Sequence, residues 1–210
     1  MNPLTKKKIS IAILITAIVC GSLGLFIAFS SEGAPYLFFT NLGNCLYLSV
    51  ALIVLVAQCL ALSKKKDLPR WAFVLHYVGT ATETLIFLIV CLYLVWVSGP
   101  ALLYKGSFIF LHVICPLLAI GNHYFFIGKA DFKNQDGLYA FLPPLLYACV
   151  LIPLCITKTV EPPYPFLDFS ANPWWLSLLF SIASLVIMWL ICYALIAYVR
   201  KTQAIVEKSR

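Results

Sequence analysis

Apolar residues fill six long windows of the chain, and short polar stretches separate them. The windows cover about residues 9–29, 39–62, 71–97, 107–126, 138–156 and 174–198. Each is close to the length of about 20 residues that a helix needs to cross the hydrocarbon core of a bilayer. The stretches between them contain Pro, Gly, Asn, Asp or Lys, which are typical of loops. The pattern predicts an all-α polytopic membrane protein, a bundle of six transmembrane helices that forms one domain over residues 1–210.

The composition supports this class. Hydrophobic residues make up 62% of the chain and charged residues 11%, with a mean hydropathy of +0.96. A soluble domain of this length could not hide so much apolar surface, so we expect a multi-pass protein of the cell membrane. The first window is too long for the apolar region of a signal peptide and no cleavage site follows it cleanly, so we expect it to be retained.

The net charge of +7 bears on topology rather than on a nucleic-acid partner. Only Lys105 and Lys158 lie in the stretches after the first, third and fifth windows. By the positive-inside bias, both termini are predicted to face the cytoplasm, in agreement with an even number of spans. The basic loops could also contact anionic lipids. The other basic residues fall near the termini or after the second and fourth windows: Lys6, Lys7, Lys8, Lys64, Lys65, Lys66, Arg70, Lys129, Lys133, Arg200, Lys201, Lys208 and Arg210.

The eight cysteines lie mostly inside the windows, at irregular spacing and without a C-x-x-C pair. They are expected to be small buried apolar residues. Neither a disulfide framework nor a metal site is predicted, and no cofactor is implied.

Two polar residues in different windows are predicted to share one depth. The second window runs inward from the outer face, so Thr40 lies near that face. The fourth window also runs inward, and His112 lies about one turn from its outer end. A hydroxyl beside an imidazole is the minimal arrangement for nucleophilic catalysis. The amides at the start of a helix, with Asn41 and Asn44, are candidates for holding an oxyanion.

Each of these residues also has a purely structural interpretation. Thr40 could be an ordinary N-cap. The two asparagines could be hydrated or bonded to another helix. His112 could bond a neighbouring backbone group, and Pro116 is expected to kink its helix and to free the His112 carbonyl.

Three further polar residues lie within the windows. Glu83 is the only acidic residue far inside a span, and it could serve a proton path or a structural bond between helices, of which we favour the bond. It is placed too deep to orient His112. For His76 and His123, toward the cytoplasmic side, separate interfacial roles are favoured over a pair.

The last outer stretch, TKTVEPPYPFLDFSANPWW, is rich in Pro and aromatic residues and could cover the site. Tyr164 and Asp168 are candidates for an orienting or covering role. Asp168 could orient His112 or cap the sixth helix, and we favour the cap. Trp174 and Trp175 are typical of interfacial anchors.

Three short motifs occur in order along the chain: FFTNLGN, LHVICP and YPFLD. Together they resemble the androgen-induced and androgen-dependent six-span membrane proteins and their microbial relatives. The resemblance implies an intramembrane threonine hydrolase of lipid esters, including fatty acids esterified to hydroxy fatty acids. It places the nucleophile at Thr40 and the histidine at His112. The chain departs from microbial relatives at Gly43 and Leu111, where Ser and His are common.

The predicted function is therefore hydrolysis of a lipid ester near the outer leaflet, or the related acyl transfer to a lipid alcohol. The predicted partners are a lipid substrate and the membrane, not nucleic acid, and the sequence does not set the oligomeric state. One alternative is a small-molecule-binding or transport protein such as a vitamin-binding importer component. Its first span would need a face of small residues, and Ala12, Thr16 and Cys20 form a weak version of one. A structural or regulatory subunit is the other alternative.

Overall fold

The chain folds into a bundle of long helices. The structure is a computed structural model that describes residues 2–31, 33–126 and 131–208, and over these residues it contains no β-strand. Lys129 and Arg210 lie outside the described residues. Each of the six predicted windows falls on a helix, as expected. The elements are α1 (Pro3–Ser31), η1 (Pro35–Leu37), α2 (Phe39–Ser63), α3 (Arg70–Ile89), η2 (Val90–Leu94), α4 (Val95–Ser98), η3 (Pro100–Leu103), η4 (Ile109–Ile114), α5 (Cys115–Phe126), α6 (Asp136–Ile156), η5 (Pro165–Leu167) and α7 (Trp174–Lys208).

Within the residues that the structure describes, five helical segments are long and apolar enough to cross a membrane: Leu4–Ser31, Phe39–Ser63, Arg70–Ser98, Asp136–Ile156 and Trp174–Thr202. A sixth apolar helix, Ile109–Tyr124, is shorter. The outer surface carries large apolar side chains such as Phe26 and Leu92, which are 70% and 66% exposed. Such a surface suits hydrocarbon rather than water, so the fold is that of a multi-pass helical membrane protein.

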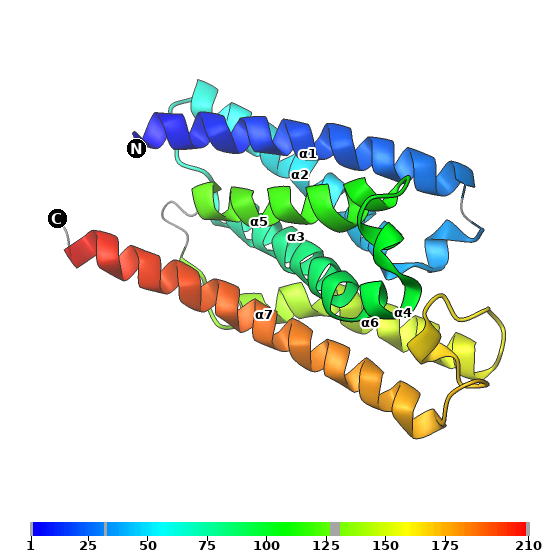
Figure 1. The fold of residues 1–210 in the computed structure, drawn as a ribbon. Helices are drawn as coiled ribbons and strands as arrows, with labels where there is room; N and C mark the ends of the chain where they lie inside the picture. Colours follow the sequence, from blue (N-terminus) through cyan, green and yellow to red (C-terminus); the bar gives the residue numbers. More distant parts are fainter. Residues whose placement is uncertain (1, 32, 127–130, 209–210) are drawn as a thin grey trace.

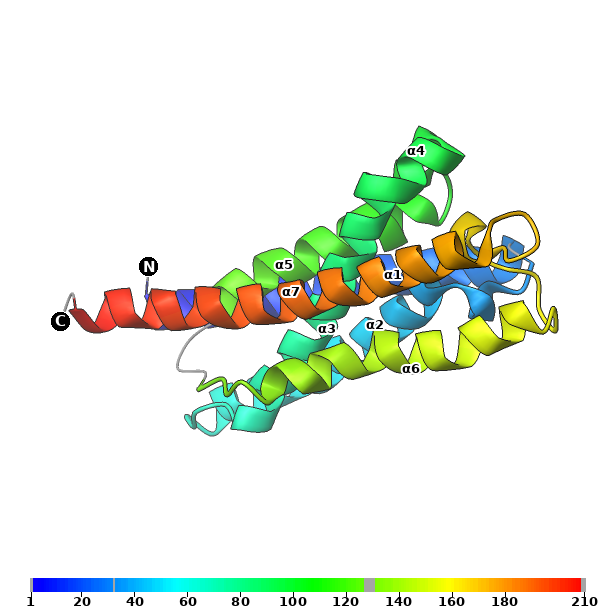
Figure 2. The ribbon, with the colours of Figure 1, turned by 90° about the horizontal axis from the view of Figure 1, so that it is seen from below.

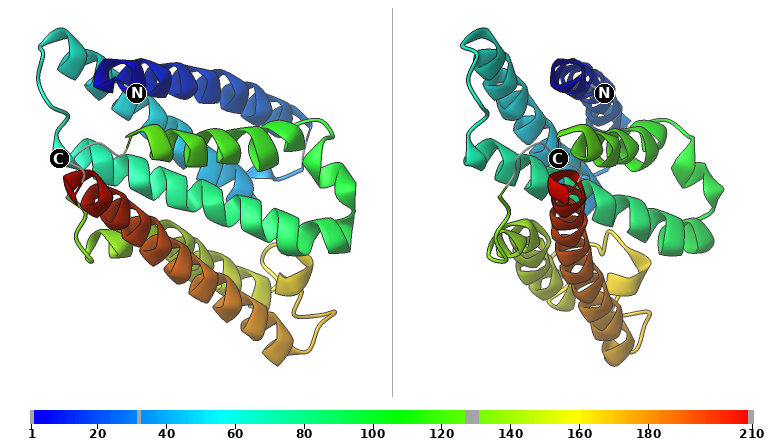
Figure 3. Two further views of the ribbon diagram at one scale, coloured as in Figure 1. Left: turned by 60° about the vertical axis from the view of Figure 1, so that its left-hand side comes forward. Right: turned by 90° about the vertical axis from the view of Figure 1, so that its left-hand side faces the viewer.

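Helix α3 lies at the centre of the bundle. It contacts α2 and α5 on one side and α6 and α7 on the other, while α1 covers α2 and α5 (Figures 1 and 3). The side chains form two apolar clusters that correspond to these two sides. The short α4 stands out from the bundle, and the chain returns from it through η3 to η4 and α5 (Figure 2).

Helix α1 packs closely against η4 because a glycine, Gly24, lies on the face of α1 that meets η4. A Cβ atom at Gly24 would approach the Cβ of Phe110 and a terminal carbon of Leu111 to 2.7 Å. The absence of a side chain therefore lets η4 lie directly against α1. Ala12 and Thr16 are exposed on the outside of the bundle.

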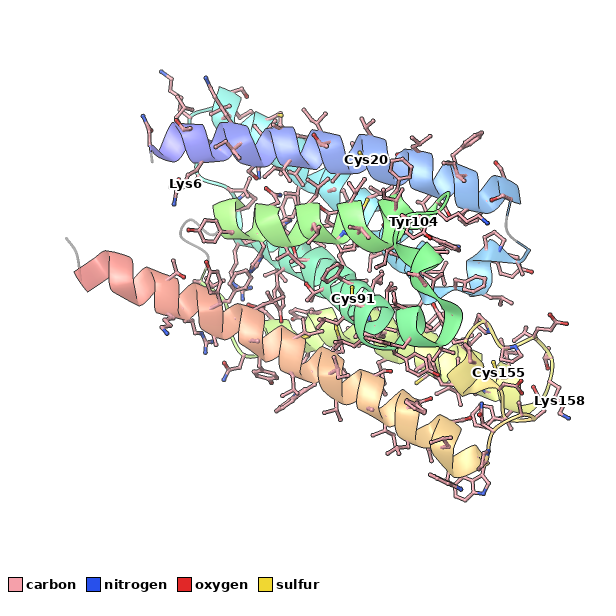
Figure 4. The ribbon with its side chains drawn as sticks, in the orientation of Figure 1. Lys6, Cys20, Cys91, Tyr104, Cys155 and Lys158 are labelled. Atoms are coloured by element: carbon pink, nitrogen blue, oxygen red, sulfur yellow. The ribbon has the colours of Figure 1, made fainter. Side chains whose placement is uncertain are left out.

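The two ends of the bundle differ. Both termini lie at one end, and the segments η1, η3 and η5 gather at the other (Figure 1). Lys6 and Lys158 lie at opposite ends (Figure 4). We refer to the end with η1, η3 and η5 as the loop end.

Two histidines that we expected to act separately form a pair. The rings of His76 on α3 and His123 on α5 stack with their centroids 5.8 Å apart, and both side chains are buried. The expectation of interfacial positions was wrong because both rings face the contact between α3 and α5 instead of the bundle surface.

Glu83 is fully buried, and neither of its carboxyl oxygens has a hydrogen-bond partner among the described residues. Its ionisable neighbours are Tyr47 and Cys115. All eight cysteines are free thiols, of which Cys59 and Cys149 are exposed rather than buried.

An ion pair ties the start of α6 to the start of α3. The guanidinium of Arg70 donates to both carboxyl oxygens of Asp136, at 2.8 and 2.6 Å. The backbone N–H of Lys133 donates to the same carboxylate at 2.7 Å. The Asp136 side chain is fully buried, while that of Arg70 is 42% exposed.

This asymmetry predicts unequal effects of breaking the pair. Arg70→Gln leaves a buried carboxylate without its cation, and we expect a loss of about 3 kcal/mol. Asp136→Asn leaves a cation that can turn to water, and we expect a loss of about 1 kcal/mol. Thermal unfolding in detergent, with the double variant as the control, checks this. An Asp136→Asn protein less stable than Arg70→Gln would contradict it.

Candidate active site

Thr40 and His112 line the same pocket at the loop end. The pocket has a volume of about 300 Å³. Its walls come from the start of α2, the η2–α4–η3 hairpin, η4 and the stretch around η5. The residues that line it are Gly33, Phe38, Thr40, Asn41, Leu94, Ser98, Leu102, Phe108, His112, Pro163, Tyr164 and Pro165. The folded chain thus brings together two residues that were singled out from the sequence.

Thr40 lies in the first turn of α2 but is not its N-cap. The N-cap is Phe38, whose backbone is extended and whose carbonyl accepts from the amides of Asn41 and Leu42. The interpretation of Thr40 as an N-cap is therefore wrong. Its own amide N–H donates to the phenol oxygen of Tyr164 at 3.4 Å, and its side chain is 7% exposed. The hydroxyl is consequently free of a capping role.

Two tyrosines from distant parts of the chain hold this turn. The phenol oxygen of Tyr164 also lies within hydrogen-bonding reach of the Thr40 hydroxyl, the Phe39 amide and the Tyr147 hydroxyl. Tyr147 on α6 donates its own hydroxyl to the carbonyl of Leu37 at 2.6 Å. The Thr40 amide, which has no partner within the helix, is thereby satisfied by the Tyr164 phenol.

Burial dominates the electrostatics of Tyr164. Loss of solvent raises the pKa of its phenol, and the hydrogen bonds with Thr40 and Phe39 oppose that rise. Phe38 packs edge-on against the Tyr164 ring at 5.9 Å. The phenol is therefore neutral at physiological pH and keeps its proton for hydrogen bonding.

The His112 ring is held by a stacked phenylalanine and by a hydrogen bond at one nitrogen. Its Nδ1 lies 2.7 Å from the carbonyl oxygen of Leu102. The ring of Phe108 stacks parallel to it at 5.1 Å. Because a carbonyl can only accept, Nδ1 carries the hydrogen of the neutral ring, and Nε2 is the basic nitrogen.

The helix around His112 is irregular in a way that the sequence suggested only in part. Pro116 was expected to produce a kink. The residues before it, Ile109–Ile114, form a π-helix. A wider turn accommodates the proline ring and the missing N–H. A second π-helical segment, η2, ends at Leu94, which also lines the pocket.

Asn41 and Asn44 have different positions. The amide of Asn41 donates to the Pro35 carbonyl at 3.0 Å, and the residue lines the pocket. Asn44 lies behind Thr40, where its amide nitrogen donates to the carbonyls of Thr40 at 2.9 Å and Leu111 at 3.1 Å. Both of its N–H groups are used, so Asn44 joins the turn of Thr40 to that of His112 rather than pointing at an oxyanion.

Asp168 neither lines the pocket nor caps α7. Its Oδ1 accepts from the Ser170 hydroxyl at 2.6 Å and from the amides of Ser170 and Ala171. These bonds, led by that of the Ser170 hydroxyl, lower the pKa of Asp168. The carboxylate closes the turn that precedes α7, which begins only at Trp174, so the expected helix cap was wrong.

A second, narrower pocket opens beside the first. This inner slot has a volume of about 70 Å³ and shares Thr40, Leu94 and Tyr164 with the first pocket. It runs between α3, α6 and α7, and most of its lining is aliphatic. A hydrocarbon chain fits such a lining.

The two pockets are lined by uncharged and apolar residues. None of the described residues that line either pocket carries a fixed charge. Among residues 2–31, 33–126 and 131–208, no three His, Cys, Asp or Glu side chains are grouped as a metal site would require. The site is thus built from neutral hydrogen-bonding groups and apolar walls.

Sequence reasoning missed two contributors. The carbonyl of Leu102 is a backbone atom and has no sequence signature. Tyr147 lies within an apolar window, with nothing nearby to mark it. Tyr164 was found because it belongs to a motif.

Comparison with known proteins adds no identification. No family model, curated protein or solved structure matches the chain.

Proposed function

We propose that this protein is an intramembrane hydrolase of lipid esters, with Thr40 as nucleophile and His112 as general base and acid. The observation that carries the proposal is that these two residues line one uncharged pocket, with a basic His112 Nε2. The short helix Ile109–Tyr124 counts as the sixth span. The termini lie in the cytoplasm, and the loop end lies at the outer face.

The first step forms an acyl-enzyme. The Thr40 Oγ attacks the ester carbonyl carbon while His112 Nε2 takes the hydroxyl proton. The carbonyl oxygen becomes an oxyanion beside the N-terminal end of α2, whose dipole favours negative charge. Tyr164 supplies a hydroxyl at the same place, and Asn41 lines the adjoining wall. The carbon–oxygen bond of the ester then breaks, and His112 returns the proton to the leaving alcohol.

The second step releases the acid. Water attacks the acyl carbon, and His112 takes a proton from that water. The bond to Thr40 Oγ breaks, and Oγ recovers the proton from His112. The balance is one ester and one water consumed, and one carboxylic acid and one alcohol formed. A lipid alcohol in place of water would give acyl transfer with the same groups.

The substrate class follows from the walls of the site. A pocket without fixed charge does not select a charged head group at the reacting centre. The mostly aliphatic slot beside Thr40 suits the acyl chain of the ester. The surrounding membrane supplies such chains at high local concentration. Neutral esters of long-chain acids therefore fit best.

The proposed topology can be tested with reporters. We expect a reporter at Lys158 to lie outside the cytoplasm and one after Lys201 to lie inside, because basic residues concentrate on the inner side. Fusions to a periplasmic phosphatase and a cytoplasmic fluorescent protein measure this. Finding both positions on the same side would overturn the topology.

The catalytic roles predict non-additive losses. Thr40→Ala and His112→Ala should each lower hydrolysis of a long-chain nitrophenyl ester about 10²–10⁴-fold. The double variant should be little worse than either single variant, because the two residues act as one unit. Thr40→Ser keeps a hydroxyl and should retain measurable activity.

A matched control removes a different hydroxyl. Thr84 donates to the carbonyl of Thr80 at 2.7 Å on α3, outside both pockets. Thr84→Ala should hydrolyse the ester at the wild-type rate. Full activity in Thr40→Ala, with the protein folded, would exclude Thr40 as nucleophile.

Glu83 should matter for stability rather than for turnover. It lines neither pocket and is fully buried. Glu83→Gln should therefore lower the unfolding temperature or the expression level more than the rate of ester hydrolysis. A variant with unchanged thermal stability and abolished turnover would show that Glu83 serves the reaction.

A further inference from the structure

A third pocket lies between α2 and α6 on the outer surface of the bundle. This groove has a volume of about 360 Å³. Its α2 wall includes Leu42 and Leu46, and its α6 wall includes Leu146 and Val150. Leu146 and Val150 are 61% and 63% exposed, so the groove opens on the outer surface of the bundle. It is distinct from the pocket that holds His112.

The groove and the inner slot have common walls. Phe39, Tyr147 and Leu151 line both. The rings of Phe39 and Tyr147 lie 5.0 Å apart and are tilted against each other. Only a thin layer of side chains therefore separates the surface groove from the slot that reaches Thr40.

Tyr147 is the polar residue of this layer, and it lines both the groove and the slot. Its hydroxyl donates to the Leu37 carbonyl at 2.6 Å and also lies within hydrogen-bonding reach of the Phe39 backbone and of the Tyr164 phenol. The backbone hydrogen bonding of α6 is interrupted one turn before Tyr147, because Pro143 and Pro144 lack the N–H groups that would donate there. Pro143 lines the groove and Pro144 lines the slot. The helix can bend at the level where the two spaces adjoin.

We infer that the groove between α2 and α6 is a lateral entrance through which a lipid acyl chain passes from the bilayer into the inner slot, with Tyr147 as its gate. This inference rests on the proposed function and adds the route and the binding place of the chain. The occupant is a hydrocarbon chain of a membrane lipid, because the groove is mostly apolar, opens on the apolar outer surface of the bundle and shares three lining residues with the slot that reaches Thr40.

The entrance is tested with a lipid ester that carries a photoactivatable diazirine at the end of its acyl chain. The full-length protein is reconstituted in phospholipid vesicles, irradiated and digested, and the cross-linked peptides are mapped. In the wild type we expect cross-links to slot residues such as Leu85 and Leu185, as well as to the groove. Leu146→Trp fills the groove and should lower slot cross-linking about tenfold, the scale of an overpacked contact.

Leu142→Trp is the matched control. Leu142 is 44% exposed on α6 and lines none of the three pockets. It should leave slot cross-linking unchanged, and thermal unfolding should show both variants folded. The entrance would be overturned if the wild type gave no cross-links to slot residues. It would also be overturned if Leu146→Trp gave as many of these cross-links as the wild type.

Fluorophosphonate probes separate this inference from the proposed function. A long-chain probe should react more slowly with Leu146→Trp than with the wild type, whereas a short-chain probe, which needs no slot, should react equally with both. Equal rates for the long-chain probe would contradict the entrance while Thr40 remained the nucleophile. If neither probe reacted with the wild type but the expected cross-links formed, the proposed hydrolase function would be rejected while the lateral entrance was supported.

Discussion

The start of α2 must satisfy its backbone amides inside an apolar bundle, and the candidate site depends on how it does so. The first amides of a helix have no partner within the helix, and in a membrane an unpaired amide is costly. Here Tyr164 accepts from the Thr40 amide, Tyr147 holds the preceding turn through the Leu37 carbonyl, and Asn44 joins the same turn to η4. The groups that satisfy the backbone therefore also fix the Thr40 hydroxyl in the pocket with His112.

The same constraint explains why the histidine is oriented by a carbonyl. A carboxylate beside His112 would be a buried charge, which is expensive without full pairing. The Leu102 carbonyl selects the ring tautomer without adding a charge. The Leu102 carbonyl can reach His112 because the chain turns back after α4, so that η3 lies against η4. The only acidic residue that sequence reasoning proposed for this task, Asp168, instead closes an exposed turn through Ser170 and Ala171.

Features that depend on neighbouring residues could be predicted from the sequence, whereas contacts between distant segments could not. The helices were predictable because length and hydropathy depend on neighbouring residues. The charges of the loops led us to expect Thr40 and His112 at one level, and in the structure both residues line one pocket. The bonds of Asn44, the stacking of His76 on His123 and the contacts of Tyr147 were not predictable, because each joins distant segments. The π-helix before Pro116 was foreseen only as a disturbance, since a proline does not determine which irregular turn forms.

The central claim is that Thr40 is an activated nucleophile, and the most direct test is to locate a covalent adduct. The protein in membranes is treated with a fluorophosphonate, digested and analysed by mass spectrometry. The account predicts a single adduct on the peptide that contains Thr40, formed at a rate that falls sharply in His112→Ala. An adduct confined to a serine outside the pocket, or a Thr40 adduct that forms equally fast without His112, would contradict it.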